Sequence, residues 1–178
     1  MVLLLYGDNM AKDKFLTVFA VFDNQTQLKL KALQEIIIEN AKSKGTQSRD
    51  IPFHITLGSF PTSKEKELTE RIERVCSLTK CFDIDLTHVN FFGSRVVFIE
   101  PSVNESLIKL HNEFDNNYAN GFDWHAHATL FIDERQEVVD KIKPIAIQCF
   151  KPMKSRIVGV QMGEFFPTRM ITEKDLLK

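Results

Sequence analysis

The chain has 178 residues, of which 43% are hydrophobic and 26% charged, so it has the composition of a folded domain, or of two small lobes sharing one core. Disorder is excluded as its main state, and no apolar run approaches the roughly 20 residues that cross a bilayer. The net charge of −1 argues against a protein that binds duplex DNA along its length. The same charge is compatible with a cleft that binds a small phosphate-bearing ligand.

Three cysteines, Cys76, Cys81 and Cys149, are an odd number without C-x-x-C spacing. This argues against a disulfide framework and against a cysteine-rich zinc site, so we expect a cytoplasmic protein. Residues 1–9 are untypical, whereas Met10 opens an ordinary soluble start. We hypothesise that translation begins at Met10; an intact mass that includes Met1 would reject this.

Strand and helix patterns alternate along the first half of the chain. In order, we expect a buried strand over 15–22, a helix over 25–44 that ends at Gly45, a strand over 53–60, a helix opened by the capping box Thr62-x-x-Glu65, and a strand from Phe82 that turns at 93–94 into a strand over 95–99.

The same order then recurs. We expect a helix opened by the capping box Ser102-x-x-Glu105 with an apolar stripe reaching Tyr118, a strand over 126–132, a helix capped by Asp133-x-x-Gln136 and ended by Pro144, two strand-like runs within 147–166, and a peripheral polar tail from Thr168. Residues 15–94 and 95–166 are therefore interpreted as pseudo-repeats within a single bilobal domain over 1–178. The predicted fold class is α+β, with two pseudo-symmetric lobes, each an antiparallel sheet with flanking helices, around a central cleft.

One tetrapeptide pattern lies on the equivalent strand of each repeat. It reads His54-Ile-Thr56-Leu in the first repeat and His127-Ala-Thr129-Leu in the second. One such match is expected by chance only about 0.03 times in a chain of this composition. Because side chains at i and i+2 of a strand point the same way, each histidine shares a face with its threonine. Two such strands facing each other place two imidazoles and two hydroxyls around one point.

This set of groups suits phosphodiester hydrolysis. Two histidines near neutral pH can act as base toward water and as acid toward the leaving oxygen. Two threonine hydroxyls can donate to the non-bridging oxygens, where negative charge develops. The chemistry needs no cofactor and no metal, and the sequence does not tell which histidine is the acid.

The motifs and the duplicated order resemble the two-histidine (2H) phosphoesterase superfamily, which includes bacterial 2'-5' RNA ligase-like proteins and eukaryotic cyclic phosphodiesterases. The resemblance covers Phe15 to about Phe166. It implies catalysis by His54 and His127, phosphate binding by their threonines, and substrates such as 2',3'-cyclic phosphates, cyclic phosphate derivatives of ADP-ribose or 2'-5' bonds in RNA. One departure is Phe53, which stands before the first histidine where many members have proline.

Four further residues are candidates for substrate binding. His125 shares the strand face of His127 and can contact substrate at the cleft edge, or can be a polar loop residue. Trp124 can stack on a base or serve as a packing anchor. Arg95 and Lys151 are candidates for neutralising phosphate, against the alternative of solvated surface residues.

Two rival functions remain open. In the first, the same cleft binds a nucleotide or an RNA end without turnover. In either case we expect a monomer. Alternatively, His125-x-His127 is a metal-ligand pattern on a strand, but no third ligand has supporting spacing, so we expect no metal. The expected partner is a small nucleotide or RNA terminus, with no membrane and no duplex DNA.

Overall fold

The computed structural model describes residues 14–47, 50–115 and 123–178. The questioned start at residues 1–9 and the expected helical position Tyr118 lie outside these ranges. The described strands and helices, in chain order, are β1 (Phe15–Phe22), α1 (Asn24–Ala41), β2 (His54–Pro61), a 3₁₀ turn (Thr62–Lys64), α2 (Glu65–Cys76), β3 (Phe82–Phe92), β4 (Val96–Pro101), α3 (Glu105–Asn112), β5 (Ala128–Ile132), α4 (Gln136–Cys149), β6 (Met153–Phe165) and β7 (Arg169–Asp175).

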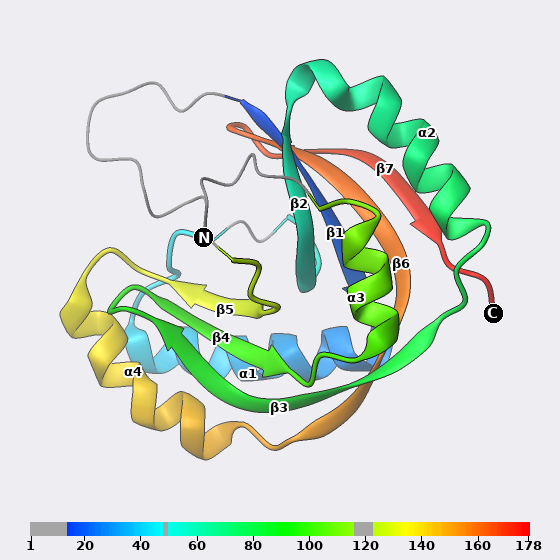
Figure 1. The fold of residues 1–178 in the computed structure, drawn as a ribbon. Coiled ribbons are helices and arrows are strands. Elements are labelled where there is room, and N and C mark those ends of the chain that lie inside the picture. Colours follow the sequence, from blue (N-terminus) through cyan, green and yellow to red (C-terminus); the bar gives the residue numbers. More distant parts are fainter. Residues whose placement is uncertain (1–13, 48–49, 116–122) are drawn as a thin grey trace.

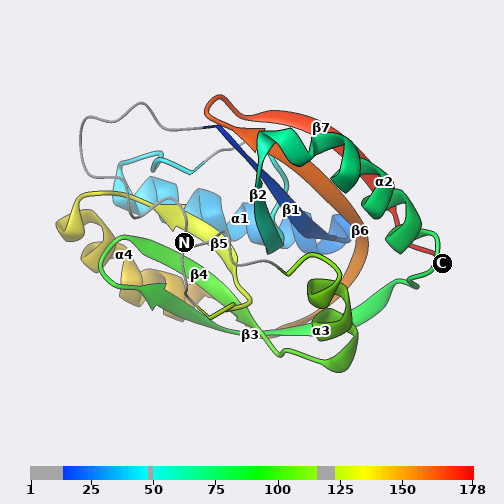
Figure 2. The same ribbon diagram turned by 45° about the horizontal axis from the view of Figure 1, so that its top comes forward.

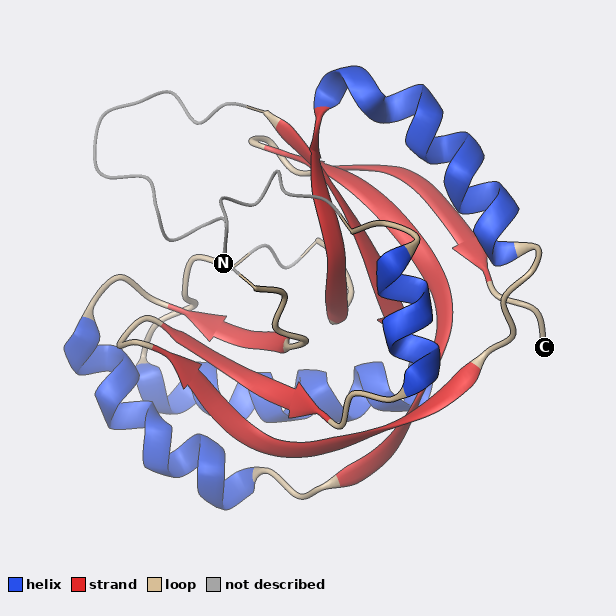
Figure 3. Ribbon diagram, viewed as in Figure 1, coloured by secondary structure: helices blue, strands red, loops and turns tan. Residues whose placement is uncertain are grey.

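The strands form one continuous antiparallel sheet rather than the two separate sheets we expected (Figure 3). Its order is β2-β1-β6-β3-β4-β5, with β7 added beside β6. The order is unchanged when β1, β2 and β3 are exchanged with β4, β5 and β6 and the path is read backwards. The α+β class and the internal symmetry of the prediction are thus present in a single strongly curved sheet.

The two long strands exchange partners between the predicted repeats. The first part of β6 pairs with the first part of β3, and the remainder of β6 pairs with β1. The remainder of β3 pairs with β4. Each lobe is therefore built from both repeats: β1, β2, β6 and β7 form what we call the His54 lobe, and β3, β4 and β5 form the His127 lobe.

The helices follow the same exchange (Figures 1 and 2). Helices α2 and α3 lie on the His54 lobe, where α2 contacts β6 and β7 and α3 contacts β2. Helices α1 and α4 pack together on the His127 lobe, where α1 contacts β5 and α4 contacts β3 and β4. Their apolar faces and the inward strand residues form one core, in which Leu30, Ile37, Leu107 and Ile142 are fully buried.

The predicted capping boxes are not formed. A 3₁₀ turn precedes α2, which has no side-chain cap at Lys64. Helix α3 is capped by Asn104, whose side chain accepts from the Leu107 amide, because this asparagine sits directly before the first turn. Helix α4 begins without a side-chain cap at Arg135. The Asp133 carboxylate instead binds the Arg135 guanidinium at 2.8–2.9 Å.

Several predicted boundaries are also wrong. Helix α1 ends at Ala41, and the left-handed residue that closes it is Lys42 rather than Gly45. Pro144 lies inside α4, which continues to Cys149, because buried Ala146 keeps the last turn packed against the core. Only one strand, β6, therefore follows within 147–166. The tail from Thr168 is mostly exposed, as expected, but it also forms a strand that was not expected, β7, which pairs with β6.

Candidate active site

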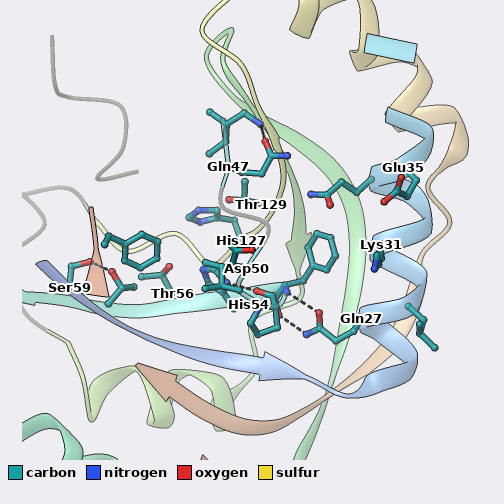
Figure 4. Close-up of a pocket in the computed structure, with 18 of the residues that line it drawn as sticks. Gln27, Lys31, Glu35, Gln47, Asp50, His54, Thr56, Ser59, His127 and Thr129 are labelled. Carbon is teal, nitrogen blue, oxygen red and sulfur yellow. Dashed lines mark hydrogen bonds between the residues drawn. The ribbon is translucent and has the colours of Figure 1, made fainter. Parts of the chain in front are cut away.

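Strands β2 and β5 bring both sequence motifs to one cavity (Figure 4). His54, Thr56, His127 and Thr129 all line it and are half-buried. The alternate residues of both motifs, Ile55, Leu57, Ala128 and Leu130, are at most 1% exposed and belong to the core under the helices. The predicted alternation of the two strands is confirmed, and it explains why each histidine shares a face with its threonine.

The two motifs have matching surroundings. Thr56 pairs with Phe19 of β1 and Thr129 pairs with Phe98 of β4, and each pairing lies next to a register irregularity. Each phenylalanine is fully buried. The Phe19 ring lies 4.3 Å from the His54 ring, between centroids, and the Phe98 ring lies 5.4 Å from that of His127. A bulge re-aims the side chains next to it, and in each motif it lies directly after the threonine. Each histidine lies two residues before its threonine and over an aromatic ring, and His127 directly precedes β5.

Each imidazole is held in one tautomer by the chain just before it. His54 Nδ1 lies 2.8 Å from the Pro52 carbonyl oxygen, and His127 Nδ1 lies 2.7 Å from the His125 carbonyl oxygen. A carbonyl can only accept, so both Nδ1 atoms carry the hydrogen. Both Nε2 atoms are left with a lone pair, which is the form a general base needs.

Burial keeps both rings neutral. Desolvation lowers the pKa of His54 and that of His127 to about 4, and the carbonyl that accepts from each ring opposes this shift only partly. Repulsion from a protonated His54 further lowers the pKa of His127. Simultaneous protonation of both rings is therefore disfavoured, which suits a pair in which one histidine is the neutral base and the other the protonated acid.

A side chain of α1 fixes the turn that leads to His54. The Gln27 amide donates to the Phe53 carbonyl oxygen at 2.8 Å and accepts from the Phe53 amide at 2.9 Å. This paired hydrogen bond holds the residue that departs from the proline of the family pattern. Strand β2 consequently begins at the histidine itself.

The cavity has room beyond the motif residues. Its volume is about 640 Å³, which is within the range of small-molecule sites. Helix α1 forms one wall with Leu28, Lys31 and Glu35, and Phe15 and Phe165 lie at another. Lys31 is the single lysine or arginine among the described lining residues.

Two of the four additional candidates lie near the motif strands but outside the described lining of the cavity. The Trp124 ring stacks on His111 at 3.9 Å, and its Nε1 donates to the Thr56 carbonyl oxygen at 2.8 Å. It therefore acts as a packing anchor in this structure rather than as a stacking platform. His125 Nε2 lies 3.6 Å from a carboxylate oxygen of Glu100 on the exposed side of β4.

The two basic candidates have other surroundings. Arg95 forms an ion pair with Glu134 at 2.9 Å, and Lys151 is exposed in the turn between α4 and β6. Neither residue is among the described residues that line the cavity of the two histidines.

The ligand set of a metal hydrolase is not assembled in the described ranges. There, no three His, Cys, Asp or Glu side chains are placed together to hold an ion. The rings of His125 and His127 are 6.4 Å apart, and the main chain between them is already used to hold His127 Nδ1.

Two glutamines of α1 were missed in the sequence. Gln27 and Gln34 are seven residues apart and both contribute to the cavity wall. The one signal in the sequence was a polar residue among the apolar positions of the expected helix, because Gln34 lies between Leu33 and Ile37. In the structure Gln34 is 7% exposed.

A family model of the 2'-5' RNA ligase superfamily matches residues 25–162, a range that includes both motifs. The chain belongs to this superfamily of 2H phosphoesterases. Membership supports an activity of the phosphodiesterase type. A comparison with curated protein sequences gave no match.

Solved structures agree on the fold. E. coli LigT complexed with ATP has a TM-score of 0.62 and 19% identity, over 93% of this chain and 98% of LigT. LigT complexed with 3'-AMP has a TM-score of 0.62 and 16% identity, over 94% and 100%. The protein TT0787 of Thermus thermophilus has a TM-score of 0.58 and 14% identity, over 91% and 97%.

Proposed function

We propose that the chain is a metal-independent phosphodiesterase that hydrolyses cyclic phosphates or 2'-5' phosphodiester bonds of nucleotides or RNA ends. The observation that carries this proposal is the pair of imidazoles in one cavity, each with Nδ1 hydrogen-bonded to a carbonyl and each beside a threonine. The described cavity also has the volume of a site for one nucleotide.

In the proposed reaction the scissile phosphate lies between His54 and His127. The neutral Nε2 of one histidine takes a proton from water, whose oxygen attacks phosphorus in line. The P–O bond to the departing ribose oxygen breaks, and the protonated Nε2 of the other histidine supplies the proton to that oxygen. Thr56 and Thr129 hydroxyls donate to the non-bridging oxygens, where charge develops.

Because the pKa of each ring is low, both imidazoles are neutral before substrate binds. The general base is therefore already present, whereas the general acid forms only when substrate binds. An anionic phosphate between the imidazoles attracts a proton, so we expect substrate to raise the pKa of one histidine. Repulsion between the two rings then keeps the other neutral. The assignment of acid and base depends on which ribose oxygen leaves, and it reverses in the ligation direction.

The cellular setting follows from the same residues. Both histidines come from one chain, so we propose that a monomer in the cytoplasm is sufficient. Cys76, Cys81 and Cys149 are unpaired, as expected in a reducing compartment. None of the helices in the described part of the chain combines the length and the apolar character of a bilayer span.

The test is turnover of a panel of 2',3'-cyclic nucleotides in excess EDTA. We expect wild type to release a 2'- or 3'-monophosphate, and His54→Ala and His127→Ala to lose nearly all activity. The matched control is His88→Ala, because His88 is exposed and pairs with Glu100 at 3.0 Å, away from the cavity lining. Near wild-type rates in both motif variants would refute the mechanism.

A second panel separates the remaining functions. Without release from cyclic nucleotides, 2'-5'-linked oligonucleotides and cyclic phosphates of ADP-ribose are tested next. Tight binding without turnover of any of these would favour a binding module. Activity lost in EDTA and restored by zinc would favour a metal hydrolase.

A further inference from the structure

Helix α1 is hydrogen-bonded to both motif strands. Near its start, the Gln27 amide is paired with the Phe53 peptide, directly before His54. Two turns later, Gln34 Nε2 donates to the Leu130 carbonyl oxygen at 2.7 Å, three residues after His127. Seven residues of helix span about 10.5 Å, and residues seven apart lie on nearly the same face. One rigid element thus contacts the chain beside each histidine.

The sheet itself does not set the distance between these strands. Strands β2 and β5 lie at opposite ends of the sheet path, so no ladder of hydrogen bonds joins them. The curvature of the sheet brings β2 and β5 into direct contact without hydrogen-bonded pairing between them. Buried carbonyls require a partner, which makes the bond from Gln34 to Leu130 an obligatory contact rather than an incidental one.

The helix is well anchored between its two glutamines. Leu30 is fully buried and Leu33 is 7% exposed, both in the main core. The Asp23 side chain caps the first turn by accepting from the Thr26 amide at 3.0 Å. A helix fixed in this way transmits a displacement at one end to the other.

A second connection between the two motif strands runs through Trp124. Trp124 lies three residues before His127, and its Nε1 donates to the Thr56 carbonyl oxygen on β2. The Trp124 ring is held in turn by His111 of α3, whose Nδ1 lies 3.1 Å from the Leu57 carbonyl oxygen. The two motif strands are therefore connected through α1 on one side and through Trp124 on the other.

We propose that α1 is a strut that fixes the spacing of His54 and His127, with Gln27 and Gln34 as its positioning residues. The inference rests on the proposed function, because spacing matters where two groups act on one phosphorus atom from opposite sides. We assign neither glutamine a contact with the reacting atoms, because the side-chain amide of each is hydrogen-bonded to main-chain groups. Their contribution is to hold the geometry in which attack and departure are in line.

The test uses Gln27→Met and Gln34→Met, which keep side-chain length and remove the amide. We expect each variant to lower kcat about tenfold or more, because a misplacement of about 1 Å can cost about 10²-fold. KM should stay within about threefold, since the groups that contact substrate are retained. The double variant should lose little more than either single variant, because a strut released at one end no longer positions the other.

The matched control is Ile72→Ala, which removes a fully buried side chain from α2, a helix whose main strand contacts are with β6 and β7. We expect it to lower the melting temperature at least as much as the glutamine variants while kcat stays near wild type. The strut is refuted if Ile72→Ala lowers kcat equally, or if the losses of the two glutamine variants multiply in the double variant.

A readout without substrate separates this inference from the proposed function. Nitrogen-15 NMR titration of the imidazoles follows His127 in wild type and in Gln34→Met. Looser spacing weakens the repulsion from His54 and admits water, so the pKa of His127 should rise in the variant and not in Ile72→Ala. If wild type hydrolyses nothing, the proposed function fails while this titration still decides the strut; an unchanged pKa of His127 would refute it.

Discussion

Mild acid should destabilise the folded chain through its two motif histidines. Each has an ordinary pKa of 6.5 and a folded pKa of about 4. Between pH 6.5 and pH 4 these histidines are protonated in the unfolded chain but neutral in the folded chain. Stability contributed by the neutral rings is therefore complete above about pH 6.5, declines as the pH falls, and stops declining below about pH 4.

The magnitude follows from the two pKa values. Linkage between pH 7.5 and pH 5 gives about 2 kcal/mol of lost unfolding free energy for each histidine. Water that reaches the cavity screens the charge and reduces this figure. Carboxylates with a lowered pKa have ordinary values of 3.8 or 4.5 and lose most of their contribution below pH 5; they are Asp23, Glu67, Glu105, Asp133 and Asp140. The comparison of pH 7.5 with pH 5 therefore reports mainly on histidines.

The assay is urea unfolding at pH 7.5 and at pH 5, followed by the fluorescence of Trp124, the single tryptophan. Wild type is compared with the double variant His54→Asn/His127→Asn. We expect the double variant to keep most of the stability that wild type loses on acidification. A smaller loss remains in both, because burial also lowers the pKa of His111. Equal losses in the two proteins would show that the motif histidines are not held neutral by the fold.

Three further predictions concern the surroundings of the histidines. Thr56→Val and Thr129→Val should each lower the turnover rate by about 10²–10³, in a steady-state assay, because each removes one donor to the developing charge; unchanged rates would exclude their role at phosphate. Gly58→Ala should lower the unfolding free energy by about 1–3 kcal/mol in urea titrations, since its new methyl carbon would lie 2.2 Å from the Phe114 carbonyl oxygen. Trp124→Phe should cost about 1–3 kcal/mol by the same measurement, because it leaves the Thr56 carbonyl without its indole donor; a fully stable variant would mean that water replaces the indole.

The sequence was informative where structure is local. Period-two alternation predicted that His54 and His127 lie on one strand face and Ile55 and Ala128 on the other, and burial confirms this. The helix boundaries were less accurate, because capping depends on which side chain reaches the first turn. Asn104 has that position at α3, although the spacing of Ser102 and Glu105 matched a capping box.

The sequence was uninformative where partners are distant. The exchange of β3 and β6 between the lobes depends on pairings such as Ile84 with Ser155, which leave no periodic signal. The same holds for Trp124, whose neighbours in the chain suggested the cavity while its indole is hydrogen-bonded to β2. Gln34 was hidden because its partner is a carbonyl 96 residues away.

The symmetric strand order has a consequence for chain connectivity. Phe15 at the start of β1 is paired with Phe165 at the end of β6, and their rings stack at 5.4 Å. Phe92 and Val96 are paired in the same way at the hairpin between β3 and β4. A circular permutant opened in that hairpin and closed directly from β6 to β1, without β7, would keep every pairing among β1 to β6. Which motif comes first along the polypeptide is therefore immaterial to the architecture of the cavity.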